Sequence, residues 1–277
     1  MPASQHKCRI CGINAPLHET GRVINNNYAL CRCDSCETVL IEKQPEAAEI
    51  TSIYNQLFEK GEYEQHRVEF ETIKSGKVPP NFYRTHLLRR IERMCRGRTL
   101  IEIGGGTGAF GVLATSRGWE YTDYDISEAA VAFCRKLSLK ANLFNFGAIP
   151  PLPPQSTDVV VMWEVIEHIF NLNEYLKRIR EALRTNGIFL FSTPNYLAPS
   201  YHRSDCWGPL AAPPVHMNFF TKESLERALT LCGFKKYRIF KQRIYRPSRS
   251  LSGLTKSLRA ALFLDEPETL HGIALKE

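Results

Sequence analysis

Several features are absent from the sequence of 277 residues, and each absence excludes a class of protein. No run of about 18 apolar residues occurs, so we expect no membrane-spanning helix. Residues 1–7 lack the apolar segment that directs secretion, and we therefore expect a cytoplasmic protein. Hydrophobic residues make up 43% of the chain, an ordinary globular content, and the length suits one α/β domain with a small appendage.

Cysteine is plentiful by contrast, and nine cysteines without an export signal favour metal-binding thiols over disulfides. Two Cys-x-x-Cys pairs lie 21 residues apart: Cys8 with Cys11, and Cys33 with Cys36. Each pair can place two thiolates on one ion, and together they complete a tetrahedral zinc site, with Cys31 as an alternative to Cys33. Four cysteine ligands leave no open coordination position, so this zinc would be structural. We expect a zinc-ribbon module over residues 1–45, with a hairpin of strands 22–24 and 28–30.

A glycine-rich turn after a short apolar strand organises the rest of the chain. Residues 100–103 are typical of a buried strand, and glycines at 104, 105, 106 and 108 lead into a helix over 110–117. Glycine lets the backbone bend sharply and approach a ligand closely, and the helix N-terminus offers free N–H groups. The spacing Glu-x-Gly-x-Gly-x-Gly over 102–108 matches neither the dinucleotide fingerprint nor the P-loop. The turn predicts a nucleotide-like ligand.

An acid near the end of the next strand fits the same site. The strand is expected over 119–127, and Asp125 lies 19 residues after Gly106. A carboxylate at about this distance from the glycines accepts hydrogen bonds from both ribose hydroxyls. Asp123 is the alternative residue for this role. Ser127 is predicted to cap the helix that follows.

A Glu-x-x-Glu-His string after a later buried strand is the third chemical feature. The strand is expected over 158–162, and Glu164, Glu167 and His168 would share one face of the following helical turn. Two carboxylates and an imidazole can bind a divalent cation. Such a cation lowers the pKa of a hydroxyl group and makes it a nucleophile. The alternative is that these residues line a ligand pocket without metal.

Periodic apolar residues predict the remaining elements. Helices are expected over 49–59 and 81–95 in a helical lead at 46–95, over 173–185, and after Thr221, which should cap its helix with Ser224 at the third position. Strands are expected over 188–191, 236–245 and 271–276. The loop 196–215 should line an acceptor pocket.

A basic stretch occurs late in the chain. Residues 235–264 contain nine Lys or Arg and no acid, within a net charge of +7. We expect a basic helical insertion at about 246–268, which overlaps this stretch. Three interpretations stay open: a solvated face, a surface for an anionic or carrier-bound acceptor, and an RNA or membrane surface.

These motifs, in this order, resemble the class I S-adenosylmethionine (SAM)-dependent methyltransferases of the ubiquinone-biosynthesis or methyltransferase 23 type, with an N-terminal zinc ribbon. The motifs are the glycine turn, Asp-x-Ser at 125–127, Glu-Val-Ile-Glu-His at 164–168, Thr-Pro-Asn at 193–195 and Asn-Phe-Phe-Thr at 218–221. The resemblance implies an α/β fold: a Rossmann-like seven-stranded sheet with helices on both faces. It also implies that residues 96–277 form the catalytic domain and that the lead 46–95 covers the cofactor.

The resemblance implies the site residues as well. The residues expected to bind SAM are Glu102, Gly104, Gly105, Gly106, Gly108, Asp125, Ile126, Asn145, Phe146, Trp163 and Glu164. Many relatives have Asp-Ala at the positions of Asn145 and Phe146, so the amide of Asn145 would have to replace a carboxylate at the adenine. The expected catalytic residues are Glu167, His168 and His216, with either imidazole as base or metal ligand.

The function implied is methyl transfer to a small-molecule acceptor, at a hydroxyl oxygen of a specialised metabolite, sugar or quinone-like compound. One alternative is a metal-assisted RNA 2′-O-methyltransferase, whose binding would weaken steeply with salt. The other is an inactive binding subunit that kept the fold.

Overall fold

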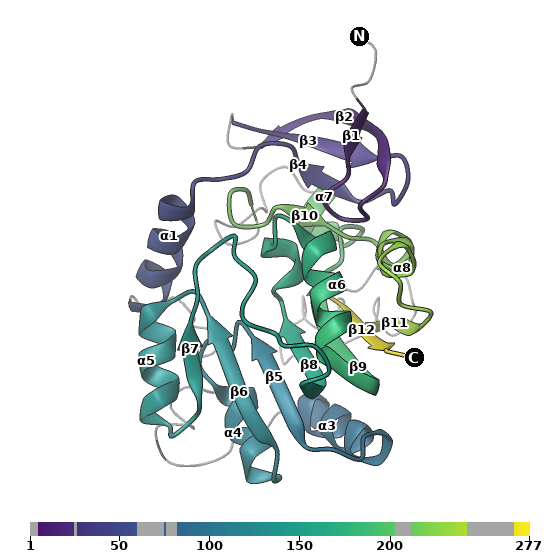
Figure 1. Cartoon of the computed structure of the whole chain (residues 1–277). Helices are drawn as coiled ribbons and strands as arrows, with labels where there is room; N and C mark the ends of the chain where they lie inside the picture. Colours follow the sequence, from purple (N-terminus) through teal and green to yellow (C-terminus); the bar gives the residue numbers. More distant parts are fainter. Residues whose placement is uncertain (1–4, 25–26, 60–74, 76–81, 203–211, 243–268) are drawn as a thin grey trace, which may run out of the picture.

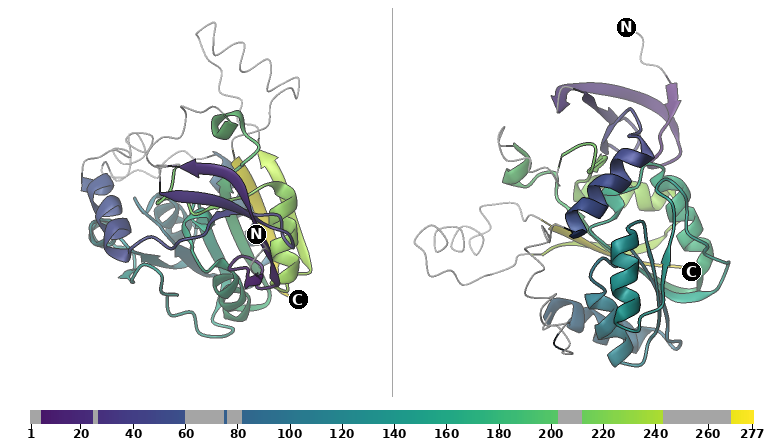
Figure 2. Two further views of the ribbon diagram at one scale, coloured as in Figure 1. Left: turned by 90° about the horizontal axis from the view of Figure 1, so that it is seen from above. Right: turned by 90° about the vertical axis from the view of Figure 1, so that its left-hand side faces the viewer.

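The computed structural model describes residues 5–24, 27–59, 75, 82–202, 212–242 and 269–277 (Figure 1). This part of the chain forms a seven-stranded sheet and a smaller, five-stranded sheet. The small sheet lies over the carboxyl ends of the parallel strands of the large one, as the view from above also shows (Figures 1 and 2). None of the described helices is long and apolar enough to span a membrane.

The large sheet has the strand order β11-β12-β9-β8-β5-β6-β7. Its strands are β5 (Thr99–Ile103), β6 (Glu120–Asp125), β7 (Ala141–Leu143), β8 (Thr157–Trp163), β9 (Leu183–Pro194), β11 (Lys236–Gln242) and β12 (Thr269–Leu275). The neighbouring strands β9, β8, β5, β6 and β7 are parallel, and β12 runs antiparallel to both β9 and β11. The seven-stranded Rossmann-like sheet expected from the sequence is confirmed.

Alternation along β8 explains the two helical layers. Val160 and Met162 face a core shared with α6 (Leu172–Ala182) and α8 (Lys222–Leu231). Val159 and Val161 point to the other face. There they meet α3 (Phe82–Met94), α4 (Ala109–Ser116) and α5 (Glu128–Lys136). A strand of period two that is apolar on both faces is typical of a parallel sheet covered on both sides.

The small sheet joins two distant parts of the chain. Its strands are β1 (Gln5–Lys7), β2 (Asn14–Ile24), β3 (Tyr28–Cys33), β4 (Val39–Ile41) and β10 (Asn218–Phe219). The predicted hairpin is confirmed, since Ile24 pairs with Tyr28. β10 pairs with β4, so a strand from residues 218–219 completes a sheet that the sequence analysis assigned to residues 1–45 alone.

Two helix caps lie where the sequence predicts them, and one helix ends earlier than predicted. Ser127 accepts a hydrogen bond from the Ala130 N–H at the start of α5, and Thr221 and Ser224 form a capping box on α8, as predicted. The helix expected over 173–185 was predicted too long. α6 ends at Ala182, because Leu183 is already extended with ψ 138° and begins β9.

Two predicted segments can be followed only in part. The lead 46–95 contains α1 (Ala47–Glu59) and α3, close to the predicted helices. The basic insertion at about 246–268 lies outside the described residues, as do the residues of the predicted 236–245 strand beyond Gln242.

Candidate active site

A cavity of about 430 Å³ lies at the carboxyl ends of β5, β6 and β8. The glycine turn after β5 forms one part of its wall, and the 3₁₀ segment η2 (Ile166–His168) after β8 forms another. Such a position, where neighbouring parallel strands end, is the usual ligand site of an open α/β sheet. The cavity is also within the volume range of ordinary small-molecule sites.

The glycine turn and the acids of β6 are joined by hydrogen bonds. The Gly106 N–H donates to Asp125 Oδ2 at 3.0 Å, and the Ser127 N–H donates to Asp125 Oδ1 at 2.8 Å. The Gly105 N–H donates to Asp123 Oδ1 at 3.0 Å. Asp125 lines the cavity, whereas Asp123 is fully buried and is not among the lining residues. Burial raises the pKa of Asp125, and its bonds from backbone N–H groups oppose that shift.

Gly106 differs from the other three glycines of the motif. A Cβ at Gly104 would meet Val165, and one at Gly108 would meet Leu139 and Cys134, each within 3.0 Å. A Cβ at Gly105 would meet the Asp123 carboxylate. A Cβ at Gly106 would meet nothing within 4 Å, and its φ of +54° is left-handed. The missing side chain of Gly106 therefore leaves room on the cavity side of the turn.

The cavity wall beyond β6 and β7 is aromatic. Phe144 and Phe146 both line the cavity, as does Ile126 after β6. Asn145, predicted to bind the adenine, is exposed and is not among the lining residues. β7 ends at Leu143, so Asn145 lies in the loop that follows, exposed between two aromatic residues that line the cavity.

The end of β8 carries a charged corner. Glu102, Trp163 and Glu164 line the cavity together with Arg84 of α3, whose guanidinium lies 5.6 Å from the Trp163 ring. Glu164 has a left-handed φ of 54°. Burial raises the pKa of Glu164, and the charge of Arg84 opposes this. Glu102 accepts a hydrogen bond of 2.5 Å from the Tyr121 hydroxyl.

Glu167, His168 and His216 form a cluster that also lines the cavity. Each contributes one possible ligand atom, and these atoms all lie within 4.8 Å of one another. Glu167 Oε2 accepts a hydrogen bond from the Thr193 hydroxyl at 2.9 Å, so the Thr-Pro-Asn motif orients this carboxylate. Glu167 Oε1 is buried without a hydrogen-bond partner among the described residues and lies 3.7 Å from His168 Nε2.

Both imidazoles of the cluster favour the neutral form. Burial lowers the pKa of His168 to about 4 and lowers the pKa of His216 well below its ordinary value. His168 Nδ1 lies 2.8 Å from the Val215 carbonyl, which can only accept, so Nδ1 is the protonated nitrogen. His168 Nε2 then carries a lone pair toward Glu167. His216 Nδ1 lies 3.1 Å from the Tyr201 hydroxyl, in α7 (Pro199–His202).

This cluster has the chemistry of a cation site or a proton acceptor. Burial raises the pKa of Glu167 well above its ordinary value, and the charge of Glu164 adds to the shift. A divalent cation would offset that cost and fits two imidazoles and a carboxylate. Glu164, which the sequence analysis placed in the same ligand set, is outside the group that the described residues form.

The four cysteines of the predicted ribbon form a second cluster. The sulfur atoms of Cys8, Cys11, Cys33 and Cys36 all lie within 4.8 Å of one another, and Cys31 is not among them. A hydrogen bond with Cys11 lowers the pKa of Cys8 to about 7, and hydrogen bonds with the same thiol lower that of Cys33. The pKa values of Cys11 and Cys36 are raised. Buried thiols that share protons in this way suit a dication that replaces those protons.

Several cavity residues were not predicted from the sequence. Gln44, Tyr54, Phe144, Phe170 and Tyr175 line the cavity, and they come from a connector, from α1, from loops and from α6. Among these residues only Phe144 belongs to a sequence pattern, its Phe-x-Phe spacing with Phe146.

Comparison with known proteins gives one consistent family. A family model described as a methyltransferase domain (methyltransferase 23) matches residues 78–239. A probable S-adenosylmethionine-dependent methyltransferase of Mycolicibacterium smegmatis is 31% identical over 164 residues, covering 58% of this chain and 62% of that protein. A ubiquinone biosynthesis O-methyltransferase of Rickettsia canadensis is 26% identical over 106 residues, covering 37% and 45%. The chain thus spans less than two thirds of these relatives.

A solved structure shows the same fold. The S-adenosylmethionine-dependent methyltransferase of Mesorhizobium loti superposes with a TM-score of 0.53 at 22% identity, covering 69% of this chain and 96% of that one.

Proposed function

The chain belongs to the methyltransferase-domain family, and from this premise we propose that it transfers the methyl group of SAM to a hydroxyl oxygen of a small-molecule acceptor. The single observation that carries the proposal is the continuity of one cavity from the glycine turn to the Glu167, His168 and His216 cluster. The glycine turn suits a nucleoside, and the cluster suits a hydroxyl that must lose its proton.

The cofactor end of the proposal uses the glycine turn and β6. Asp125 would accept hydrogen bonds from both ribose hydroxyls, since backbone N–H groups already fix the direction of its carboxylate. The open side of Gly106 leaves space for the ribose and the amino-acid part of SAM. Phe144 and Phe146 offer apolar faces for the adenine, and Glu102 offers a carboxylate for the ammonium group.

The transfer step is an in-line displacement at the methyl carbon. The acceptor oxygen would form a bond to this carbon as the carbon–sulfur bond breaks, and the electron pair of the broken bond would stay on sulfur, which becomes a neutral thioether. Most of the rate comes from holding the reacting atoms about 3 Å apart. Without a cation in the cluster, the proton of the hydroxyl would pass to an imidazole, where His168 Nε2 carries a lone pair.

A divalent cation fits the same cluster. Glu167, His168 and His216 would hold it, and it would lower the pKa of an acceptor hydroxyl next to it. Thr193 keeps one oxygen of Glu167 in place and leaves the other directed at the two rings. The ubiquinone O-methyltransferase relative supports an oxygen acceptor.

Zinc is proposed for the four-cysteine cluster. The spacing of the two pairs, the proximity of the four sulfur atoms and their burial all suit a closed structural site.

Titration with S-adenosylhomocysteine (SAH) tests the cofactor site. We expect the parent protein to bind SAH and Asp125→Ala to bind it about 100-fold more weakly, because two charge-assisted hydrogen bonds are lost. Glu120→Ala removes an exposed acid at the other end of the same strand and should change the dissociation constant less than twofold. Absence of SAH binding by the parent, or an unchanged affinity in Asp125→Ala, would overturn the proposal.

A further inference from the structure

Arg9 lies between two of the clustered cysteines, and its guanidinium reaches out of the small sheet. Nη1 donates to the Phe170 carbonyl at 2.6 Å and to Asn218 Oδ1 at 2.8 Å. Nη2 donates to the Ile41 carbonyl at 2.7 Å and to the Met217 carbonyl at 3.1 Å. The group also lies 4.0 Å from the centre of the Phe170 ring. One side chain thus joins the small sheet to two segments of the large unit, which is the seven-stranded sheet with its helices and connecting loops. These are the segment after η2 and the segment that leads into β10.

Both segments carry residues of the proposed acceptor site. Phe170 follows His168 by two residues, and Met217 follows His216 directly. The two segments also bond to each other, because the Met217 N–H donates to the Glu167 carbonyl at 2.9 Å. The guanidinium of Arg9 therefore bonds to both of the segments that meet at the Glu167 carbonyl.

Asn218 extends the contact to both sides of the Glu167 and His168 pair. Its Oδ1 accepts from Arg9, which fixes the amide with its NH₂ group on the opposite side. That NH₂ donates to the Ile166 carbonyl at 3.1 Å and to the Ile169 carbonyl at 2.8 Å. These two carbonyls flank Glu167 and His168 in the sequence. Arg9 therefore orients a side chain that bonds to the backbone on both sides of Glu167 and His168.

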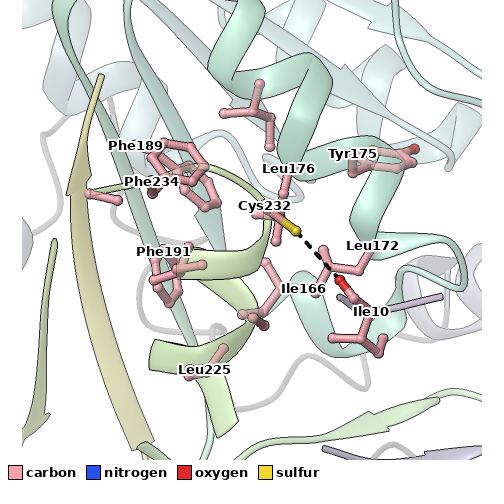
Figure 3. Packing of buried hydrophobic residues seen from close by; sticks show 14 of the residues in the cluster. Ile10, Ile166, Leu172, Tyr175, Leu176, Phe189, Phe191, Leu225, Cys232 and Phe234 are labelled. Atoms are coloured by element: carbon pink, nitrogen blue, oxygen red, sulfur yellow. Dashed lines mark hydrogen bonds between the residues drawn. The ribbon is translucent and has the colours of Figure 1, made fainter. Parts of the chain in front are cut away.

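The backbone around Arg9 is fixed against the large unit as well. The Asn173 N–H, at the start of α6, donates to the Arg9 carbonyl at 2.9 Å. Ile10 is fully buried in the same core as Ile166 and Leu172, and the Cys232 thiol lies 3.6 Å from its carbonyl (Figure 3). The turn that carries Arg9 is closed by the Gly12 N–H on the Cys8 carbonyl at 2.7 Å.

We propose that Arg9 is a positioning residue of the acceptor site, which holds the segments of Glu167, His168 and His216 in one geometry. The cysteine cluster fixes the turn from which Arg9 projects, so the small sheet serves the active site as well as its own stability. The inference rests on the proposed function for its chemical meaning. Arginine suits the task because its planar fork donates several hydrogen bonds in fixed directions, whereas lysine presents a single flexible point charge.

Amide hydrogen exchange of the full-length, zinc-loaded protein tests the positioning directly. Arg9→Met keeps an apolar stem against Phe170 and removes all four hydrogen bonds. We expect the Met217 amide, bonded to the Glu167 carbonyl, to exchange at least 10-fold faster. Amides of β5 should keep the parent's rates. Arg9→Lys should give the same pattern with a smaller effect, and it takes the place of Arg9→Met if that variant does not fold.

Manganese titration by electron paramagnetic resonance tests the consequence at the site. Mn²⁺ prefers carboxylate and imidazole ligands over thiolates, so it distinguishes the Glu167 cluster from the zinc ligands. We expect Arg9→Met to weaken Mn²⁺ binding at least 10-fold and SAH binding less than threefold, with zinc content unchanged. Glu167→Gln identifies the site, since it removes the ligand carboxylate and should weaken Mn²⁺ binding further.

Arg32→Met is the matched control. Arg32 precedes Cys33 as Arg9 follows Cys8, but its side chain is exposed. It should leave exchange, Mn²⁺ binding and SAH binding as in the parent. Unchanged exchange at Met217 in Arg9→Met and Arg9→Lys, or equal changes in Arg32→Met, would overturn the inference. If the parent binds no Mn²⁺, the proposed cation site fails, and the exchange rates still decide the role of Arg9.

Discussion

At the scale of single residues, Gly106 offers a direct test of how the turn serves a ligand. Gly106→Ala and Gly118→Ala both place a Cβ in open space at a left-handed φ, +54° and +80°. Each substitution should therefore cost about 1 kcal/mol of unfolding free energy from backbone strain. Of these two glycines, Gly106 lines the cavity and Gly118 does not. We expect Gly106→Ala alone to weaken SAH binding, by at least 10-fold in calorimetric titration. Equal SAH affinities in the two variants would contradict this.

The sequence predicted residues that belong to a spaced motif and missed those that act alone. Asp125 lies on the cavity as expected, because its distance from the glycines is set by one helix and one strand. Asn145 was chosen by analogy with relatives, and it lies exposed in the loop that follows β7. Arg9 carries no signal of its own: an arginine between two cysteines has no periodicity, and its partners lie up to 209 positions away.

At the scale of elements, strand β12 makes stability depend on pH through His271. Burial, with the charge of Arg84, lowers the pKa of His271 to about 4. In the unfolded chain a histidine titrates near 6.5, so between pH 6.5 and 4 the unfolded state binds more protons. The contribution of His271 to the free energy of unfolding is therefore complete above pH 6.5 and is lost as the pH falls toward 4. The His271 ring also stacks on the Phe240 ring, with centroids 5.7 Å apart.

Urea unfolding at pH 7.5 and 5.5 measures this effect. We expect the parent to lose about 1 kcal/mol more than His271→Gln over this interval, because the glutamine does not titrate. His86→Gln changes an exposed histidine and should retain the parent's pH dependence. Equal losses in the parent and in His271→Gln would show that His271 does not carry the dependence.

Element types were predictable, and element ends were less so. Buried strands and capped helices carry their own local pattern, and α5 and α8 begin at the predicted caps. The end of α6 depends on pairing of Leu183 with Thr157, a long-range contact that no helical period records. β10 has two residues, and it forms because β4 offers an edge beside it.

At the scale of the whole molecule, the cysteine cluster is part of the main core. Cys8, Cys11, Cys33 and Cys36 pack in the same cluster as Phe220 of the large unit. The small sheet also includes β10, and the buried Ile10 lies beside α6 (Figure 3). The sequence predicted a zinc-ribbon module over residues 1–45. The shared core predicts that the small sheet and the large sheet unfold together.

Zinc removal tests this cooperation. When a metal site is absent from the unfolded chain, the free energy of metal binding contributes to folding. Removing the zinc with a strong chelator under reducing conditions should therefore lower the melting temperature by about 10 °C or more. Calorimetry should show one transition that moves as a whole, and added zinc should restore it. A new low-temperature transition beside an unshifted main one would mean that the small sheet melts alone. In that case the hydrogen bonds of Arg9 could not couple the cysteine cluster to the segments of Glu167 and His216 under native conditions, since the large unit would keep its stability without them.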